Sequence, residues 1–273
     1  MALITSQQLS RFFEKYNDVN LTFTKDVVRA TRLLQRNTHI KCLGDHWPCV
    51  LYSCSMKGAK VIASLSKSFY EKLKSANNLV TLHLAFAQED KSTPLSFFVT
   101  SKINGFTPYD KSKPDLNFLS LEYTQRPPDD LIVILGTLAE ANINSSQRRE
   151  ERIEITADTI RKLGLKSKTG LIYIDGIPRK CIIRDLSFSG SKLILPGIGK
   201  FLLNKNALLR FELSERNKQI SLDGSVVRTE NVAGRKDLIA AAVKFEEPKV
   251  PYEYKLLIND YFNTLRSKKG NFS

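Results

Sequence analysis

Residues 40–62 and residues 172–194 align with each other without a gap, and this internal similarity constrains the fold more than any other feature of the chain. In both segments apolar residues alternate with polar ones on either side of a glycine, which is the pattern of a β-hairpin. Further strand-like segments, a proline-marked corner and an amphipathic helix follow in the same order in both halves. We therefore expect one mainly β fold, with flanking helices, to occur twice in tandem. Seven of the 23 aligned positions are identical: Ile40/Ile172, Gly44/Gly176, Cys49/Cys181, Ser55/Ser187, Gly58/Gly190, Lys60/Lys192 and Ile62/Ile194.

The apolar periodicity predicts helices at the start, in the middle and at the end of the chain. The first 38 residues are expected to be helical, including a second run at residues 26–35. A helix at residues 131–141 is followed by a polar connector at residues 142–146, and the last helix spans residues 252–265. Period-two segments predict strands at residues 39–43, 49–53, 60–65, 79–86, 96–103 and 118–123, and again at 172–174, 181–185, 192–195, 208–213, 221–229 and 240–245.

The composition indicates a globular protein of two ordinary domains. The chain has 273 residues, of which 42% are hydrophobic and 26% charged. No apolar run approaches the ~20 residues that cross a bilayer, and the first residues lack the pattern of a secretion signal. The four cysteines form no CxxC pair, which favours reduced thiols over a disulfide framework. We expect a cytoplasmic monomer that does not insert into a membrane.

The positive charge is concentrated in the second half. The formal net charge is +14; residues 1–147 carry 17 Lys and Arg against 13 Asp and Glu, whereas residues 148–273 carry 25 against 15. A domain this basic attracts anions, and the charge alone leaves open nucleotides, nucleic acid and an acidic protein surface.

One charged constellation opens this basic half. Arg148 and Arg152 lie four residues apart, and about thirty residues later Asp185, Ser187 and Gly190 follow the spacing Asp-x-Ser-x-x-Gly. An arginine offers a rigid fork of donors for phosphate oxygens or for the O6/N7 edge of guanine. A carboxylate accepts from the amino and imino hydrogens of guanine, and a glycine lets the backbone approach a ligand closely.

The first copy of the repeat lacks these charges. Ser53 stands at the position of Asp185, and the arginines upstream, Arg32 and Arg36, lie in a helical pattern too close to the hairpin. Because the fold recurs without the aspartate, the turn does not require it. This favours a functional role for Asp185 over a local turn, and for the arginines over a solvated charge run.

The two parts of this constellation, in this order, resemble the two-part signature of PilZ domains, over residues 145–262. The resemblance implies six-stranded β-barrels, here two in tandem, similar to two-domain PilZ receptors of the spirochaetal type. It also implies cyclic di-GMP as a regulatory ligand, with no further cofactor. The domains would be a degenerate PilZ-like domain at residues 1–141, a linker carrying the arginines at 142–152, and a PilZ domain at 153–273.

The resemblance also implies the roles of the site residues. Arg148 and Arg152 would grip phosphates and guanine edges, and Asp185, Ser187 and Gly190 would hold the other base. Two further arginines are weaker candidates: Arg149, because the adjacent pair is offset from the usual family pattern, and Arg228, on a later strand.

Other chemistries find less support. The spacings His39-x-x-Cys42 and His46-x-x-Cys49 invite a zinc interpretation. However, the repeat replaces Cys42 with an isoleucine and has no matching histidines, so we expect core positions and no metal. No nucleophile–base arrangement stands out, and an enzyme is not expected.

The sequence thus favours a non-catalytic receptor for cyclic di-GMP whose ligand orders the linker and changes the arrangement of the domains. An alternative is a nucleic-acid-binding protein that uses the basic half, possibly switched by the nucleotide, and a third hypothesis is a protein adaptor that acts through its N-terminal helices.

Overall fold

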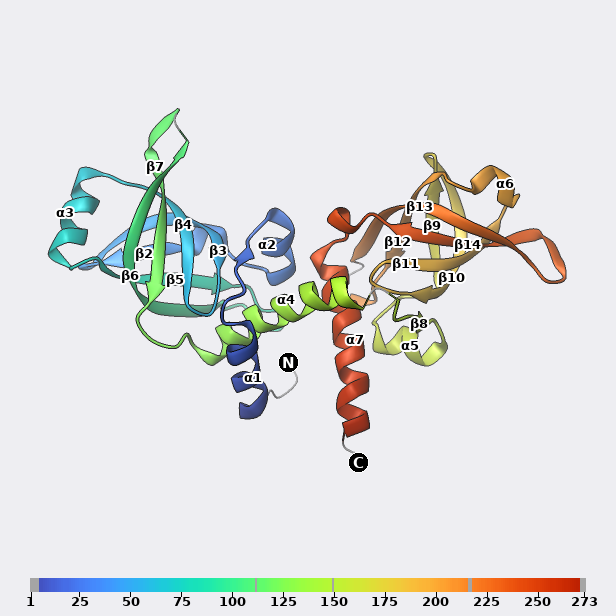
Figure 1. Ribbon diagram of the computed structural model, residues 1–273, viewed down its shortest axis with the longest axis horizontal. Helices are drawn as coiled ribbons and strands as arrows, with labels where there is room; N and C mark the ends of the chain where they lie inside the picture. The colour runs from blue at the N-terminus through green and yellow to red at the C-terminus, as the bar shows by residue number, and fades with distance from the viewer. Residues whose placement is uncertain (1–4, 111, 149, 216–217, 271–273) are drawn as a thin grey trace. The chain divides into compact units, whose positions relative to one another are not determined.

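The chain forms two compact units, residues 1–140 and residues 141–273 (Figure 1). Each unit contains one β-barrel, and the two are described separately below. Among the described residues, no helix is long and apolar enough to span a membrane. The structure is a computed structural model that describes residues 5–110, 112–148, 150–215 and 218–270.

The first barrel closes through six antiparallel strands. The strands follow one another in the order β3-β2-β5-β6-β7-β4, and β3 also pairs with β4, which closes the ring. The two-residue strand β1 adds to the side of β3. The strands are β1 (Leu21–Thr22), β2 (His39–Cys42), β3 (Asp45–Cys54), β4 (Gly58–Ser64), β5 (Leu79–Phe86), β6 (Leu95–Asp110) and β7 (Lys113–Tyr123).

The second barrel repeats this topology. Its ring runs β10-β9-β12-β13-β14-β11, the pairing of β11 with β10 closes it, and the short β8 adds to β10. Two tandem six-stranded barrels, as predicted, are therefore confirmed. The strands are β8 (Ile153–Glu154), β9 (Thr169–Ile174), β10 (Ile177–Leu186), β11 (Gly190–Pro196), β12 (Asn206–Glu212), β13 (Gln219–Val232) and β14 (Arg235–Phe245).

The two halves correspond in backbone structure beyond the segments whose sequences align. Two pairs of residues with left-handed backbone, Arg32/Gly164 (φ 59° and 60°) and Leu43/Asp175 (φ 46° and 48°), lie the same 132 residues apart as the aligned hairpins. This conformation is uncommon for a residue other than glycine, so its recurrence shows that the local backbone path is the same. Leu43 and Asp175 lie within the aligned hairpins, and Arg32 and Gly164 extend the correspondence upstream of them.

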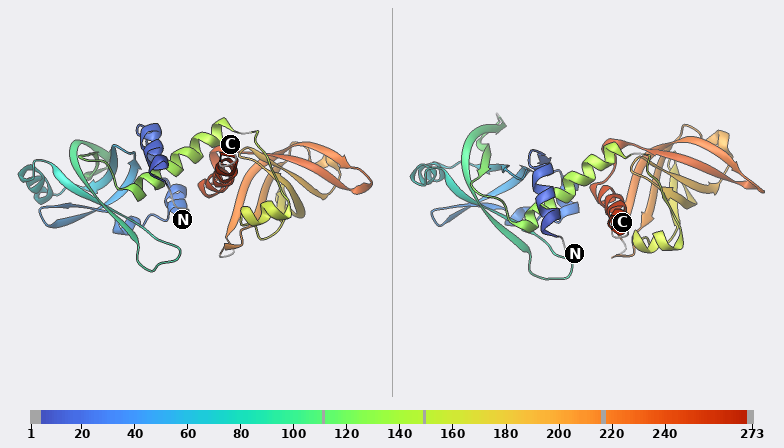
Figure 2. Two further views of the ribbon diagram at one scale, coloured as in Figure 1. Left: turned by 90° about the horizontal axis from the view of Figure 1, so that it is seen from below. Right: turned by 60° about the horizontal axis from the view of Figure 1, so that its bottom comes forward.

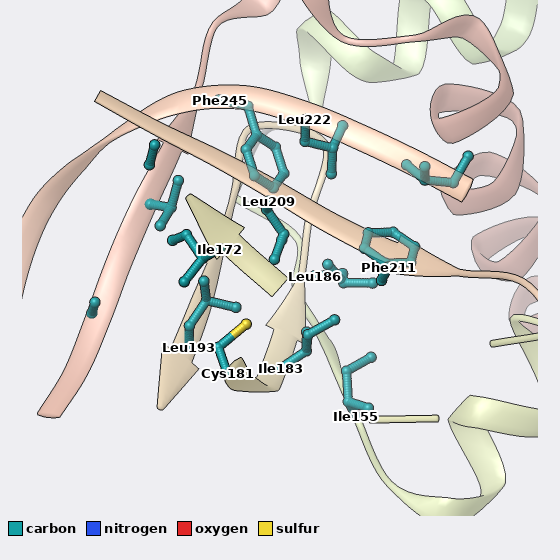
Figure 3. Close-up of a cluster of buried hydrophobic side chains, with 14 of the residues drawn as sticks. Ile155, Ile172, Cys181, Ile183, Leu186, Leu193, Leu209, Phe211, Leu222 and Phe245 are labelled. Atoms are coloured by element: carbon teal, nitrogen blue, oxygen red, sulfur yellow. The ribbon is translucent and has the colours of Figure 1, made fainter. Parts of the chain in front are cut away.

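Buried and exposed residues alternate along the strands of the second barrel, and the buried aliphatic and aromatic side chains fill its core (Figure 3). Ile183 and Leu193, neighbours on β10 and β11, are fully buried, as is Ile172 of β9. Cys181 lies in the same core, and burial raises the pKa of its thiol to about 12, so that it is a neutral apolar side chain. All four cysteines are buried and free of disulfides.

Helices pack on each barrel. In the first unit α1 lies beside α4 (Figures 1 and 2), where the ring of Phe12 packs directly onto Gly136. In the second unit α7 buries Tyr254 and Ile258 against the core. The helices are α1 (Ser6–Tyr16), α2 (Lys25–Thr31), α3 (Lys67–Ser75), α4 (Asp129–Gln147), α5 (Ala157–Lys162), α6 (Gly199–Leu202) and α7 (Tyr252–Gly270), with 3-10 turns at Gln35–Asn37 and Glu247–Lys249.

Two helix predictions were wrong. The first 38 residues are not continuously helical, because β1 interrupts them and the left-handed Arg32 ends α2 before the predicted end at residue 35. The predicted connector at residues 142–146 belongs to α4 instead. Asn144 is buried there and donates a hydrogen bond to Asn259 of α7 at 2.6 Å. This polar stretch therefore packs within the second unit, to which both residues belong.

The histidines and cysteines for which a zinc site was considered lie in the wall of the first barrel. Cys42 and Cys49 point into the core, while the imidazole rings of His39, His46 and His83 stack outside it, with centroids 4.7 and 4.5 Å from that of His39. Within the described residues, no group of three His, Cys, Asp or Glu side chains is arranged to hold a metal ion.

Candidate functional site

A tight turn between β10 and β11 carries the second half of the predicted motif. The buried Ser187 hydroxyl accepts a hydrogen bond from the Gly190 amide at 3.1 Å and donates one to the Gly190 carbonyl at 2.9 Å. From α7, the Tyr254 hydroxyl donates to the Ser187 carbonyl at 2.7 Å. Burial raises the pKa of Tyr254 well above its usual value, which keeps this donor protonated.

Glycine is required at the end of the turn. A Cβ on Gly190 would lie 2.4 Å from the carbonyl oxygen of Val243 on β14. The first barrel has the same turn, with the Ser55 hydroxyl bonded to Gly58 and a Cβ on Gly58 lying 2.3 Å from a backbone oxygen. Ser187 and Gly190 therefore hold a turn that both barrels need.

Asp185 lies just before this turn at a β-bulge, where the pairing of β10 with β11 shifts by one residue. Its Oδ1 accepts hydrogen bonds from the Lys192 amide and from Nη1 of Arg152, both at 2.8 Å. Its side chain is 17% exposed and that of Arg152 is 42% exposed. Among the described residues none donates to Oδ2, so the carboxylate is held by one oxygen and presents the other.

The structure thus brings together Arg152 and Asp185 from segments 33 residues apart. The β8 strand explains this meeting: Ile153 and Glu154 pair with Leu186 and Asp185, which places Arg152, the residue just before β8, beside the end of β10. The pair lies in an open cavity of about 600 Å³ on the outer wall of the barrel, across β8, β10, β11, β13 and β14. The cavity is lined by Arg152, Glu154, Arg184, Asp185, Lys192, Ile194, Glu230, Asn231, Val232 and Ala240.

A second charged group occupies the far side of the cavity. The Glu230 carboxylate lies 2.6 Å from Nη2 of Arg228 and 3.3 Å from Nζ of Lys192. The hydrogen bond from Lys192 and the charge of Arg228 hold the pKa of Glu230 below its usual range. Arg228 therefore borders the cavity through an ion pair without lining it.

Arg148 lies apart from Asp185. It follows the end of α4, its amide donates to the Asn144 carbonyl, and its Nε is 4.0 Å from Glu151. Its Nη1 is buried and has no hydrogen-bond partner among the described residues. Arg148 is not one of the residues that line the cavity, and Arg149 lies outside the described part of the chain.

Three side chains that shape the site were not predicted from the sequence. Lys192 was noted only as identical to Lys60 in the repeat. Glu230 reaches the cavity only because β13 pairs with β14, and Tyr254 reaches the Ser187–Gly190 turn only because α7 packs against it. None of these contacts follows from local sequence spacing.

The first barrel provides an internal comparison. The 132-residue correspondence places Tyr16, Asn20 and Ser53 at the positions of Arg148, Arg152 and Asp185, and Tyr16 is buried. An ion pair between Asp18 and Lys57 occupies the region, beside a smaller cavity of about 320 Å³. The scaffold is retained there without the arginine–aspartate pair.

Comparison with known protein families agrees with this two-barrel arrangement. Residues 7–142 match the model of the PilZN3 domain, and residues 146–261 match that of the PilZ domain. The chain belongs to the PilZ family. All of the predicted site residues lie within the matched PilZ domain, as does Tyr254.

Several proteins resemble the whole chain. A protein of Treponema denticola named "Cyclic di-GMP binding protein" is 44% identical over 266 residues, which cover 97% of this chain and 85% of that protein. A crystal structure of the Borreliella burgdorferi PlzA protein in complex with c-di-GMP is 26% identical, with a TM-score of 0.42, and covers 94% of this chain and 99% of that one. A K. pneumonia MrkH–c-di-GMP complex is 12% identical, with a TM-score of 0.32, and covers 98% and 97%.

The turn of the PilZ domain gives a stability prediction. Ser187→Ala removes both hydroxyl hydrogen bonds and leaves the buried Gly190 amide without this acceptor, so we expect the free energy of unfolding to fall by about 1–3 kcal/mol. Urea denaturation of the full chain measures the change. Ser221→Ala, on β13 of the same barrel, is the control and should change it by less than about 0.5 kcal/mol. Equal stability of the two variants would contradict the structural role of Ser187.

Proposed function

We propose that this protein is a non-catalytic receptor for cyclic di-GMP and that it binds the nucleotide on the outer wall of the second barrel. The observation that carries the proposal is the fixed pair of Arg152 and Asp185, which the PilZ domain has and the PilZN3 barrel lacks. The name of the Treponema relative supports the choice of ligand.

The ligand's chemistry matches the groups at the site. Cyclic di-GMP carries two phosphodiester anions and two guanine bases, so it needs cations for the phosphates and an acceptor for the guanine N1–H and N2–H₂ donors. Asp185 presents Oδ2 as that acceptor. Arg152 offers a planar fork to a phosphate or to the O6/N7 edge of a base. The side chains of Arg184 and Lys192 add positive charge to the same cavity.

The other predicted residues have different parts in this proposal. Arg148 and Arg149 precede Arg152 on the segment that would close over the ligand, and the buried Nη1 of Arg148 lacks a partner that a phosphate oxygen would supply. Ser187 and Gly190 keep the backbone close to the barrel wall, so that the ligand lies against the turn. Arg228 contributes charge from the rim.

The ligand also provides a route to signalling. Residues 148–152 directly follow α4, the helix that runs from one unit into the other. Binding would order this segment against the barrel and thereby change the arrangement of the domains. Small-angle X-ray scattering of the full chain should therefore show a different radius of gyration with saturating ligand. An unchanged scattering curve would contradict this step while leaving the binding site intact.

The binding site is tested by isothermal titration calorimetry with cyclic di-GMP. Arg152→Ala and Asp185→Asn should each weaken binding by roughly 10- to 100-fold, because each removes a charged hydrogen-bond partner worth about 1.5–3 kcal/mol. Asp185→Asn keeps an oxygen for the Lys192 amide and removes only the charge. Arg161→Ala, on α5 outside the cavity, removes an equal charge and should leave the affinity unchanged. Equal affinities for all four proteins would refute the site.

The same variants distinguish the receptor proposal from the alternative of a nucleic-acid-binding protein. A protein that binds phosphate backbone through its net charge would bind DNA or RNA at least as tightly after Asp185→Asn, which removes a negative charge, and less tightly after Arg161→Ala. The receptor proposal expects the opposite order for cyclic di-GMP.

A further inference from the structure

The cavity contains a carboxylate, that of Glu230, which forms ion pairs with two cations. Lys192 pairs on β11 with Ala242 of β14, and Ala242 pairs in turn with Arg228 of β13. Lys192 and Arg228 therefore flank a small residue on the outer wall. Glu230, two residues beyond Arg228 on β13, contacts Arg228 along its own strand at 2.6 Å and Lys192 across this gap at 3.3 Å.

This arrangement resembles the way a bound phosphate would be held. A carboxylate and a phosphodiester are both anions with two terminal oxygens, and each accepts hydrogen bonds from ammonium and guanidinium groups. Lys192 also donates its backbone amide to Asp185, so its position in the wall is fixed while its side chain is held by Glu230. A phosphate that enters the cavity meets a Lys192 ammonium group that is already paired with Glu230.

These ion pairs contribute little to the fold. The side chain of Glu230 is 44% exposed, that of Lys192 is 41% exposed and that of Arg228 is 68% exposed. Exposed pairs of this kind add little to stability. Glu230 also lies near the end of β13, two residues before the strand ends at Val232.

We infer that Glu230 is a built-in competitor for the ligand's phosphate: its carboxylate binds Lys192 and Arg228 and must be displaced when the nucleotide enters. This inference rests on the proposed function and adds to it the residue that sets the affinity. Through it, the protein would respond only when the second messenger reaches a higher concentration than the cations alone would require.

The charge of the competitor persists across the physiological pH range. Because Lys192 and Arg228 keep the pKa of Glu230 below its usual range, the carboxylate stays ionised at neutral and mildly acidic pH. The competition is therefore set by the ligand concentration and by salt, which screens exposed charges.

The test is calorimetric titration of cyclic di-GMP into the full chain, at low and at high salt, for the wild type and for Glu230→Gln. The glutamine keeps the shape and removes the charge, so Lys192 and Arg228 become available to phosphate. We expect binding about three- to tenfold tighter at low salt, with a smaller gain at high salt. The melting temperature of the unliganded protein should not change.

Glu212→Gln is the matched control. Glu212 is on β12 of the same barrel, its side chain is also 44% exposed, and it pairs with Lys166 at 2.6 Å, but it does not line this cavity. It changes the net charge equally and should leave the affinity unchanged.

Three results would overturn the inference. If Glu230→Gln binds as the wild type does, Glu230 does not compete; if it binds more weakly, Glu230 is a direct contact of the ligand. If both glutamine variants gain equally, the effect is one of net charge. A wild type that does not bind the nucleotide at all overturns the proposed function itself, which distinguishes that failure from the other three.

Discussion

The second barrel and its site depend on one constraint, the close approach of the Ser187–Gly190 turn to the backbone of β14. At Gly190 the chain passes so close to the Val243 carbonyl that no side chain fits. The Ser187 hydroxyl and the Tyr254 hydroxyl fix the turn from inside the barrel and from α7. Because the turn sets where β11 begins, it also sets the Lys192 amide that orients Asp185. The site is thus built on a rigid wall.

The contrast between the barrels separates what the fold needs from what it does not. Both keep the serine, the glycine and the closing strand pair, so these residues are explained by architecture. Only the second keeps a carboxylate next to the turn, together with the arginine that contacts it. The architecture that the two barrels share does not explain this arginine–aspartate pair, and our proposal assigns it to ligand binding.

The barrels and the turn could be predicted from the sequence, because alternation and glycine spacing are local patterns repeated in two halves. The end of α4 could not, because Asn144 looks like a linker residue until Asn259, 115 residues away, supplies its buried partner. The strands β1 and β8 are too short to show a period. Arg152 and Asp185 were predicted from a motif; the structure places them in contact, and leaves Arg148 outside the cavity. Glu230 could not be predicted, because one of its partners, Lys192, comes from a strand that only the folded barrel brings near it.

Binding of cyclic di-GMP to the outer wall of the second barrel is tested most directly by hydrogen–deuterium exchange of the full chain with and without the nucleotide. We expect the ligand to slow exchange in residues 150–154 and 182–192, the two segments that meet at Asp185. The equivalent segments of the first barrel, residues 18–22 and 50–60, should not respond. Slowed exchange in the first barrel alone, or no change in the second at saturating ligand, would contradict it.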